Sequence, residues 1–192
     1  MSKKNDQCRK VLHRYLPSEF VDMVVQLLND NPVNFKIVKP RKTKLGDFRW
    51  KSSDGKPQIT INGDLNPYSF LVTTLHEFAH LITFNKFGHR VSPHGKEWKI
   101  EYTKLLLPAI DSNWLPKELS IALTTSITKM KASSCTDLQL QRVLLSYNSV
   151  EDELTTLETL EKNSIFALNG RVFEKGLLRR TRFLCTEVKT KK

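Results

Sequence analysis

Cysteine is scarce in this 192-residue sequence, and its scarcity excludes several kinds of protein. The three cysteines, Cys8, Cys135 and Cys185, show no paired spacing, so we expect a reducing, cytoplasmic environment and no disulfide framework. Long hydrophobic runs are also missing. No stretch approaches the length of a membrane span, and the N-terminal residues lack the apolar core of a signal peptide. We therefore expect one compact domain, or a domain with an appendage, that does not enter a membrane.

Acidic residues are too few to balance the basic ones: 20 aspartates and glutamates stand against 31 lysines and arginines, which gives a net charge of +11. Residues 36–51 and 171–192 each carry a net charge of +6. This distribution indicates an anionic partner, and we favour a nucleic-acid phosphate backbone over the alternative of solvated strand faces. The basic residues assigned to nucleic-acid binding are Arg41, Lys42, Lys44, Arg49, Arg171, Arg179, Arg180 and Arg182.

The most informative motif is His76-Glu77-Phe78-Ala79-His80, which lies in a run that is predicted to be helical. Residues four apart lie one above the other on a helix, so His76 and His80 can present two imidazole nitrogens to one metal ion. Glu77 is close enough to take a proton from a water on that metal. Zinc suits the site because it accepts imidazole ligands and acidifies water without redox chemistry.

The helix that carries this motif has clear predicted ends. Asn66 is a plausible N-cap, Pro67 suits the first helical position, and Gly88 supplies a C-cap. Apolar residues recur at helical spacing, and neither proline nor glycine interrupts residues 68–87. Both histidines therefore fall in mid-helix. The alternative, two histidines on a solvated helix face, is less well supported by these surroundings.

A catalytic zinc needs a third protein ligand. A histidine six residues after the second one, as in metzincins, is excluded because Lys86 occupies that position. The remaining candidates are His89, His94, Glu97 and Glu101. We favour His94, because Pro93 before it and Gly95 after it would hold it at a loop-to-helix junction, where the chain can fold back over the first helix.

The motif, followed fourteen residues after its second histidine by the segment His94-Gly95-Lys96-Glu97-Trp98, resembles the SprT-like family of zinc metallopeptidases, which includes the Spartan proteases. The resemblance covers about residues 9–110. It implies that His76, His80 and His94 bind one catalytic zinc ion and that Glu77 is the general base. It also implies DNA-bound or DNA-crosslinked proteins as substrates, a role in DNA repair, and single-stranded or junction DNA as a partner.

Many members of this family carry a C-terminal zinc ribbon with two Cys-x-x-Cys pairs. In this sequence Cys185 is the only cysteine near that position, so we expect no second, structural zinc ion. We also expect a monomer, located at the nucleoid if the chain is bacterial. The tail ends abruptly on Lys189, Lys191 and Lys192, which fits a truncated chain.

The order of predicted elements indicates an α+β fold with a zincin-like metallopeptidase core over residues 1–110. This core comprises an N-terminal helical region, a small three-stranded sheet, the motif helix and a following helix that Pro108 stops. The predicted helical region is 9–30, broken at Pro17-Ser18, the strands are 34–39, 46–51 and 58–62, and the last helix is 95–106. The strand at 58–62 alternates, which predicts one buried and one open face. A strand beside the motif helix could bind an extended peptide by edge pairing.

Residues 111–162 are predicted to form a helical extension, and residues 163–192 a small basic β subdomain at the position of a degenerate zinc ribbon. The extension contains predicted helices at 116–131 and 136–147, followed by an acidic helix or linker at 150–162. Asn169-Gly170 predicts a hairpin, and a third strand at about 178–188 would complete the small sheet.

The sequence allows two roles for Phe48 and Trp50, and it allows two other functions for the chain. Phe48 and Trp50 could stack on unpaired bases, but their alternation favours packing in the core. The chain could be a DNA-binding protein that kept the zincin scaffold and lost its activity, although Glu77 is intact. It could also be a zinc hydrolase of non-protein substrates, because fold and metal do not fix the substrate.

Overall fold

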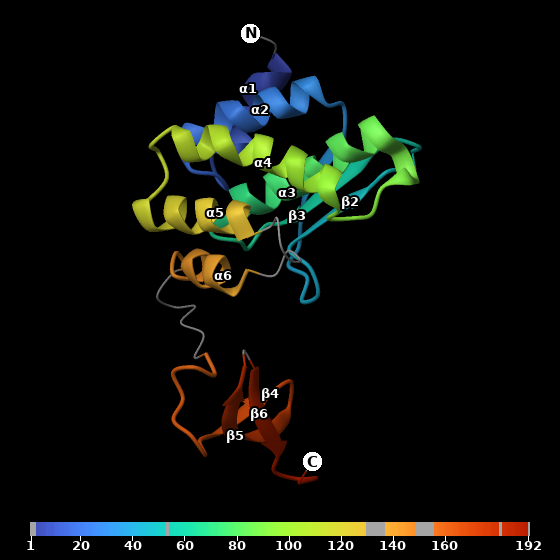
Figure 1. The fold of residues 1–192 in the computed structure, drawn as a ribbon. Helices are drawn as coiled ribbons and strands as arrows, with labels where there is room; N and C mark the ends of the chain where they lie inside the picture. The colour runs from blue at the N-terminus through green and yellow to red at the C-terminus, as the bar shows by residue number, and fades with distance from the viewer. Residues whose placement is uncertain (1–2, 53, 130–136, 149–155, 181, 192) are drawn as a thin grey trace. The chain divides into compact units, whose positions relative to one another are not determined.

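The structure, a computed structural model, describes residues 3–52, 54–129, 137–148, 156–180 and 182–191. The chain forms two compact units that divide between Asn148 and Ser149. Figure 1 shows both units, and each is described by itself below. The described residues contain helices and two three-stranded sheets, which confirms the α+β class. Within this part of the chain, no helix combines the length and the apolar character needed to span a bilayer.

The first unit begins with two helices that pack against each other, α1 (Lys3–Leu12) and α2 (Val21–Asp30). A short 3-10 helix at Ser18–Phe20 precedes α2, which confirms the predicted break at Pro17-Ser18. Phe20 and the valines of the first turns of α2 are buried, so this pair of helices contributes one wall of the hydrophobic core.

The sheet of the first unit has the strand order β1-β3-β2. Its strands are β1 (Asn34–Val38), β2 (Gly46–Arg49) and β3 (Gln58–Asn62), with β1 parallel and β2 antiparallel to β3. The prediction that β3 has one open face is wrong, because Thr60 and Asn62 are buried as well as Ile59 and Ile61. The reason is Arg41, whose guanidinium donates hydrogen bonds to the Asn62 Oδ1 and Thr60 Oγ1 atoms and covers that face.

The motif helix α3 (Pro67–Phe87) begins and ends as predicted. The Asn66 side chain accepts a hydrogen bond from the Ser69 backbone N–H at 2.9 Å, and Gly88 caps the other end with a φ of 61°. Helix α3 packs against β2 and β3 and against the following helix (Figure 1). Because it is enclosed in this way, most of its side chains are buried, including Phe70 and Phe78.

The following helix α4 (Lys96–Asp111) corrects the expectation that Pro108 stops it, because the helix continues through the proline. A proline inside a helix costs about 3 kcal/mol, since it removes one hydrogen bond and crowds the preceding turn. Leu106 and Ala109 on either side of it are almost completely buried in the core. Burial of a leucine stabilises by about 1.5–3 kcal/mol, so packing of this turn offsets most of the cost.

Helices α5 (Lys117–Lys129) and α6 (Leu138–Leu145) correspond to the two helices predicted in the extension. They pack against each other, and they belong by contact to the first unit. Cys135 and the first part of the predicted acidic segment at 150–162 lie outside the described residues. From residue 156 to residue 164 the chain forms turns.

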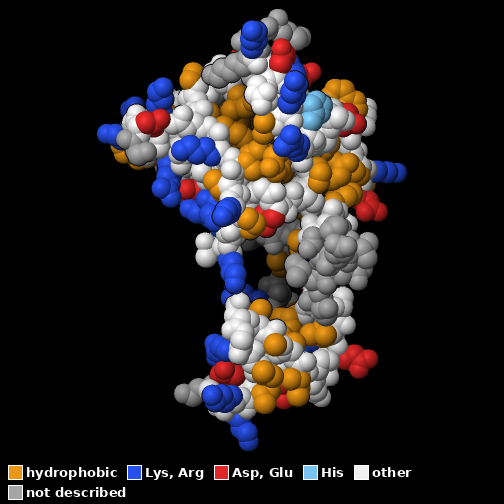
Figure 2. Space-filling view, turned by 180° about the vertical axis from the view of Figure 1, so that it is seen from behind, with side chains coloured by type: hydrophobic (Ala, Val, Ile, Leu, Met, Phe, Trp, Pro, Cys, Tyr) orange, Lys and Arg blue, Asp and Glu red, His pale blue; other side chains and the backbone are white. Residues whose placement is uncertain are grey.

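The second unit is an antiparallel sheet of β4 (Ile165–Leu168), β5 (Arg171–Arg179) and β6 (Arg182–Glu187) in the order β4-β5-β6. The predicted hairpin is confirmed: Asn169 and Gly170 have φ values of 50° and 76°, as a type I′ turn requires. The third strand begins later than predicted, because β5 runs on to Arg179. Hydrophobic side chains gather on the face of this unit that Figure 2 shows.

Candidate metal centre

Three histidines converge at the surface of α3. The Nε2 atom of His80 lies 3.3 Å from that of His76 and 3.0 Å from that of His94, and the remaining pair is 3.1 Å apart. Three nitrogens bound to one tetrahedral zinc at 2.0–2.1 Å would lie about 3.3 Å from one another. The three side chains form the one group of three potential metal ligands within the described residues. Both the spacing and the donor type therefore fit zinc.

His94 reaches the other two histidines through an unusual backbone conformation. Its φ is 59°, in the left-handed region that residues other than glycine rarely adopt. The Gly95 backbone N–H donates a hydrogen bond to the Ser92 carbonyl at 2.9 Å, which closes a turn around Pro93 and His94. This turn directs the His94 ring back toward α3, immediately before α4 begins. Strain of this kind, held by a turn, is common at functional sites.

Burial keeps the three imidazoles neutral, which is the form that binds a metal. Desolvation, together with the charge of neighbouring histidines, lowers the pKa of His76 to about 3 and that of His80 to about 4. Desolvation also lowers the pKa of His94. The indole of Trp98 lies against all three rings, with centroid distances of 4.7 Å to His76 and to His94 and 5.3 Å to His80. Trp98 thus supports the cluster from the core side.

Glu77 is buried beside the cluster, with only 7% of its surface exposed. Burial, together with the negative charge of Asp47, raises the pKa of its carboxyl to about 7, against the opposing effect of a hydrogen bond from the Phe48 backbone N–H. A carboxyl with a pKa near 7 can both accept and release a proton at neutral pH. The environment of Glu77 therefore suits a general base.

Strand β2 packs closely against Glu77 because one of its residues is a glycine. A Cβ atom on Gly46 would lie 2.6 Å from the Glu77 Oε1 atom and 2.8 Å from the Thr73 side chain, distances that real Cβ atoms essentially never show. The next residue, Asp47, accepts hydrogen bonds from Lys44 at 2.7 Å and Arg49 at 2.9 Å. These cations balance the Asp47 charge near Glu77.

The other candidate ligands lie elsewhere. Glu101 pairs with Lys86 at 2.7 Å and with Lys104 at 3.1 Å, so its carboxylate is occupied by ammonium groups. His89 packs edge-on against aromatic rings near the end of α3, and Glu97 is in the first turn of α4. The structure brings neither of them into the group of three.

The basic residues predicted to bind nucleic acid fall into two classes. Arg41, Lys44, Arg49 and Arg171 make hydrogen bonds or ion pairs within the protein. Lys42, Arg179, Arg180 and Arg182 are exposed, as are the paired Arg49 and Arg171. Arg41 is bound to β3, and Arg171 forms a two-bond contact with Glu187 at 2.8 and 2.9 Å. Residues of both classes occur in each basic segment, 36–51 in the first unit and 171–192 in the second.

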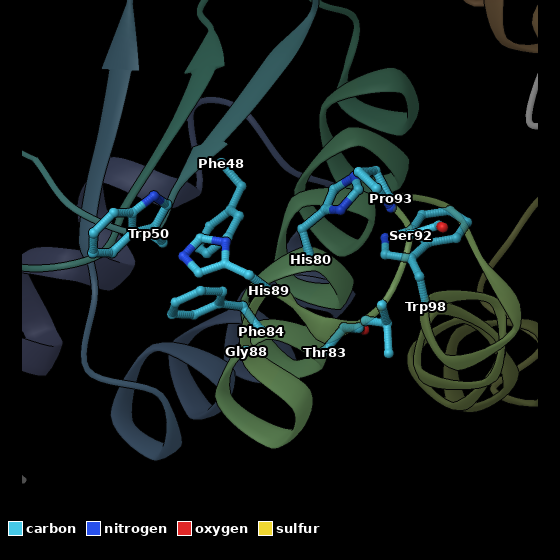
Figure 3. A pocket seen from close by; sticks show the side chains of 11 residues that line it. Phe48, Trp50, His80, Thr83, Phe84, Gly88, His89, Ser92, Pro93 and Trp98 are labelled. Carbon is cyan, nitrogen blue, oxygen red and sulfur yellow. The ribbon is translucent and has the colours of Figure 1, made fainter.

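A pocket beside the cluster is lined by aromatic residues of α3, of the turn after it and of the strand side. Its wall includes Phe84 and His89, with Phe48 and Trp50 from the strand side (Figure 3). The prediction that the aromatic side chains pack in the core is confirmed for Phe48, which packs against it. It is wrong for Trp50, which is 49% exposed because it lies beyond the end of β2 and stacks on Phe84. The signal for Phe84 was present in the sequence, since it follows His80 by four residues and shares its helix face.

Comparison with known proteins places these residues in a recognised family. Residues 15–106 match the SprT-like family. Protein SprT of Vibrio parahaemolyticus is 52% identical over 46 residues, which are 22% of this chain and 27% of that protein. Protein SprT of Pseudomonas fluorescens is 50% identical over 36 residues, 18% of this chain and 22% of the relative. Protein SprT of Actinobacillus succinogenes is 50% identical over 46 residues, 23% of this chain and 26% of the relative. The matches thus span about a quarter of each curated relative, and no solved structure matches the chain.

Proposed function

This chain belongs to the SprT-like family through residues 15–106, and from this premise we propose that it is a zinc-dependent metalloendopeptidase that cleaves DNA-bound or DNA-crosslinked proteins. The observation that carries the proposal is the convergence of three Nε2 atoms within 3.3 Å, next to a buried glutamate on the helix that carries His76 and His80. Neither a structural ion site nor a packed histidine cluster would need that buried carboxyl.

His76, His80 and His94 would hold the zinc ion, and three protein ligands leave one tetrahedral position open. When bound, zinc supplies Lewis acidity that polarises a peptide carbonyl and acidifies water. Glu77 then takes a proton from the attacking water on a carboxylate oxygen and delivers it to the leaving amine nitrogen. The Phe48 N–H orients the Glu77 carboxylate for both transfers.

Strand β2 offers a place for the peptide backbone. It is one of the two outer strands of the order β1-β3-β2, and it packs against α3, the helix that carries His76 and His80. An extended substrate can pair with the free edge of such a strand through main-chain hydrogen bonds, which bind peptides of many sequences. This arrangement supports a protein substrate rather than a small molecule.

Charge supports the DNA part of the proposal. The net charge is +11, and Lys42 in the first unit and Arg179, Arg180 and Arg182 in the second are exposed to an approaching phosphate backbone. Contacts with phosphates release counterions, so binding should weaken steeply as salt is raised. A DNA affinity that is independent of salt between 50 and 200 mM would contradict phosphate contacts.

The metal centre is tested with His94→Ala. The variant should lose most of its zinc on dialysis, as measured by elemental analysis, because two histidines on one helix are left to hold the ion. His89→Ala is the matched control and should keep the metal content of the parent chain. Full zinc occupancy in the His94 variant would show that another residue is the third ligand.

The activity is tested by digestion of casein or histone by the full chain, with and without single-stranded DNA and with a chelator. Cleavage that DNA stimulates and the chelator abolishes supports the proposal. DNA binding without cleavage under any condition would instead identify a binding protein on a zincin scaffold. Absence of both would leave a zinc hydrolase of other substrates.

A further inference from the structure

A pocket of about 260 Å³ opens directly beside the metal centre. It begins at His80, itself one of the three converging histidines, and extends past the end of α3. Figure 3 shows Phe48, Trp50, Phe84 and His89 grouped on one side of it and Trp98 on the other. Sites for drug-sized molecules usually measure about 300–1,000 Å³, so this pocket has the size for one side chain.

The wall of the pocket is aromatic. The Phe48 ring lies parallel to the His80 imidazole, with an interplanar angle of 4° and centroids 6.4 Å apart. Phe84 follows, 5.9 Å from Phe48 and 6.0 Å from the Trp50 ring. The His89 ring meets Trp50 edge-on at 5.1 Å. These rings form a continuous series from the metal ligand outward, so a residue bound at the metal would place its neighbour against them.

Two residues that line the pocket carry buried polar atoms without hydrogen-bond partners in the protein. Thr83 and Trp98 both line it, with 5% and 1% of their surfaces exposed. Among the described residues, neither the Thr83 Oγ1 atom nor the Trp98 Nε1 atom has a hydrogen-bond partner. A buried polar atom without a partner costs about 1–3 kcal/mol, so a ligand that supplies one gains affinity. None of the residues that line the pocket is a lysine, arginine, aspartate or glutamate.

We propose that this pocket binds the side chain of the substrate residue next to the scissile bond and selects a neutral aromatic side chain, with tyrosine preferred over phenylalanine. The inference rests on the proposed peptidase function. The rings supply stacking and edge-to-face contacts for an aromatic ring. A phenol oxygen can accept a hydrogen bond from the Trp98 indole N–H and donate one to the Thr83 hydroxyl. A charged side chain would be desolvated in the pocket without a counter-charge.

The test uses the zinc-loaded full chain and a series of peptides that differ at one position flanking the cleaved bond: tyrosine, phenylalanine, leucine, alanine, lysine or glutamate. We expect kcat/KM to be about 10–100-fold higher for the aromatic peptides than for the alanine peptide, the range that pocket contacts of this size give. Mass spectrometry of the products identifies the cleaved bond. Equal cleavage of all six peptides would overturn the inference while leaving the peptidase function intact. Cleavage of none of them, by a zinc-loaded enzyme that also leaves casein intact, would count against the peptidase function itself.

Two substitutions locate the preference in the pocket. Trp50→Ala, at a site that is 49% exposed, should reduce the aromatic-to-alanine ratio at least fivefold with unchanged zinc content. Trp114→Ala removes another exposed tryptophan, which packs on Phe20 away from the pocket, and should leave the ratio unchanged. If Trp50→Ala weakened DNA binding and left the ratio as it was, the pocket would stack nucleobases and the inference would be wrong.

Thr83→Val distinguishes the contribution of the hydroxyl group to substrate preference from that of the pocket's shape. Valine has nearly the same volume but has no hydrogen-bonding group, so the tyrosine-to-phenylalanine ratio should fall to about one while phenylalanine cleavage stays the same. Because the Thr83 hydroxyl has no partner in the protein, this variant should fold as well as the parent chain. An unchanged ratio would remove Thr83 from substrate recognition.

Discussion

The two units of the chain differ in the side chains that they bury. In the first unit the largest fully buried side chains are apolar, with Trp98, Phe70 and Phe78 among them. In the second unit the buried residues are Lys175 and Glu187, within the part of it that the structure describes. Its aliphatic side chains are largely exposed: Ile165, Leu168, Val172, Leu177, Leu178, Leu184 and Val188.

The difference shows what holds each unit together. A large core lets the first unit fix three histidines and a buried glutamate in one geometry, because close-packed side chains resist displacement. The second unit is too small for such a core. Its sheet is stabilised by backbone pairing, by the Arg171–Glu187 contact and by the Lys175 ammonium group, which lies 4.2 Å from the Phe183 ring centroid. The candidate metal centre therefore lies in the unit whose core can hold it in one geometry, and the described part of the second unit offers a basic surface.

The largest expected effect sharpens the assignment of chemistry to the first unit. Glu77→Gln should lower the rate of peptide cleavage by about 10²–10⁴-fold, the usual contribution of a general base. Zinc content should not change, because the three histidines remain. The loss should be the same in a chain that ends at Asn148 as in the full chain, measured with the same peptide. Glu97→Gln serves as the control at a nearby carboxyl, and a Glu77 variant as active as its parent would refute the role.

The next effect compares the two kinds of burial directly. Phe70→Ala removes a fully buried ring that stacks on Tyr15 at 5.3 Å, and it should cost about 3–5 kcal/mol of unfolding free energy in chemical denaturation. Leu178→Ala in the second unit removes a side chain that is 57% exposed and should change stability by less than about 0.5 kcal/mol. Similar losses of unfolding free energy in both variants would mean that the second unit buries its aliphatic side chains, and the contrast between the two units would be wrong.

A smaller effect is expected where β2 packs against Glu77. Gly46→Ala introduces a Cβ atom against the Glu77 carboxylate, and overpacking of this kind costs about 1–3 kcal/mol. We expect a roughly tenfold loss of kcat as Glu77 shifts, with a smaller change in KM and full zinc content. Gly55→Ala is the control for the loss of a glycine, because a Cβ atom there meets no neighbour within 4 Å, although its φ of 81° adds local strain. Unchanged kcat in the Gly46 variant would show that β2 can move aside.

The smallest effect concerns acid sensitivity of the second unit. Hydrogen bonds from Arg171 and Thr190 lower the pKa of Glu187 from 4.5 to about 2. A carboxyl whose pKa is lower in the folded state stabilises that state above pH 4.5 and loses this contribution as the pH falls toward 2. The amide NMR signals of β4–β6 should therefore report a loosening between these values. Glu187→Gln should remove this dependence on pH, whereas Glu174→Gln should retain it. A transition that is identical in all three proteins would exclude Glu187 as its cause.

Much of the site could be predicted from the sequence because its determinants are local. The spacing of His76 and His80 fixes their common helix face, and the caps at Asn66 and Gly88 fix the ends of that helix. The hairpin at Asn169-Gly170 is equally local, because few other residues accept positive φ at two successive positions. The continuation of α4 through Pro108 was missed because it depends on burial of the last turn, which local propensity does not contain.

The sequence by itself determined the chemistry of this protein: two histidines and a glutamate on one helix, a third histidine at a turn, and an excess of basic residues. Only the tertiary structure decided how these groups are tuned and what surrounds them. In the folded chain Glu77 is buried against Gly46, and Arg41 is hydrogen-bonded to β3. Phe48, Trp50 and Phe84 lie together beside His80. Spacing along one helix follows from its period of 3.6 residues, whereas contacts between strand and helix depend on packing of the whole core.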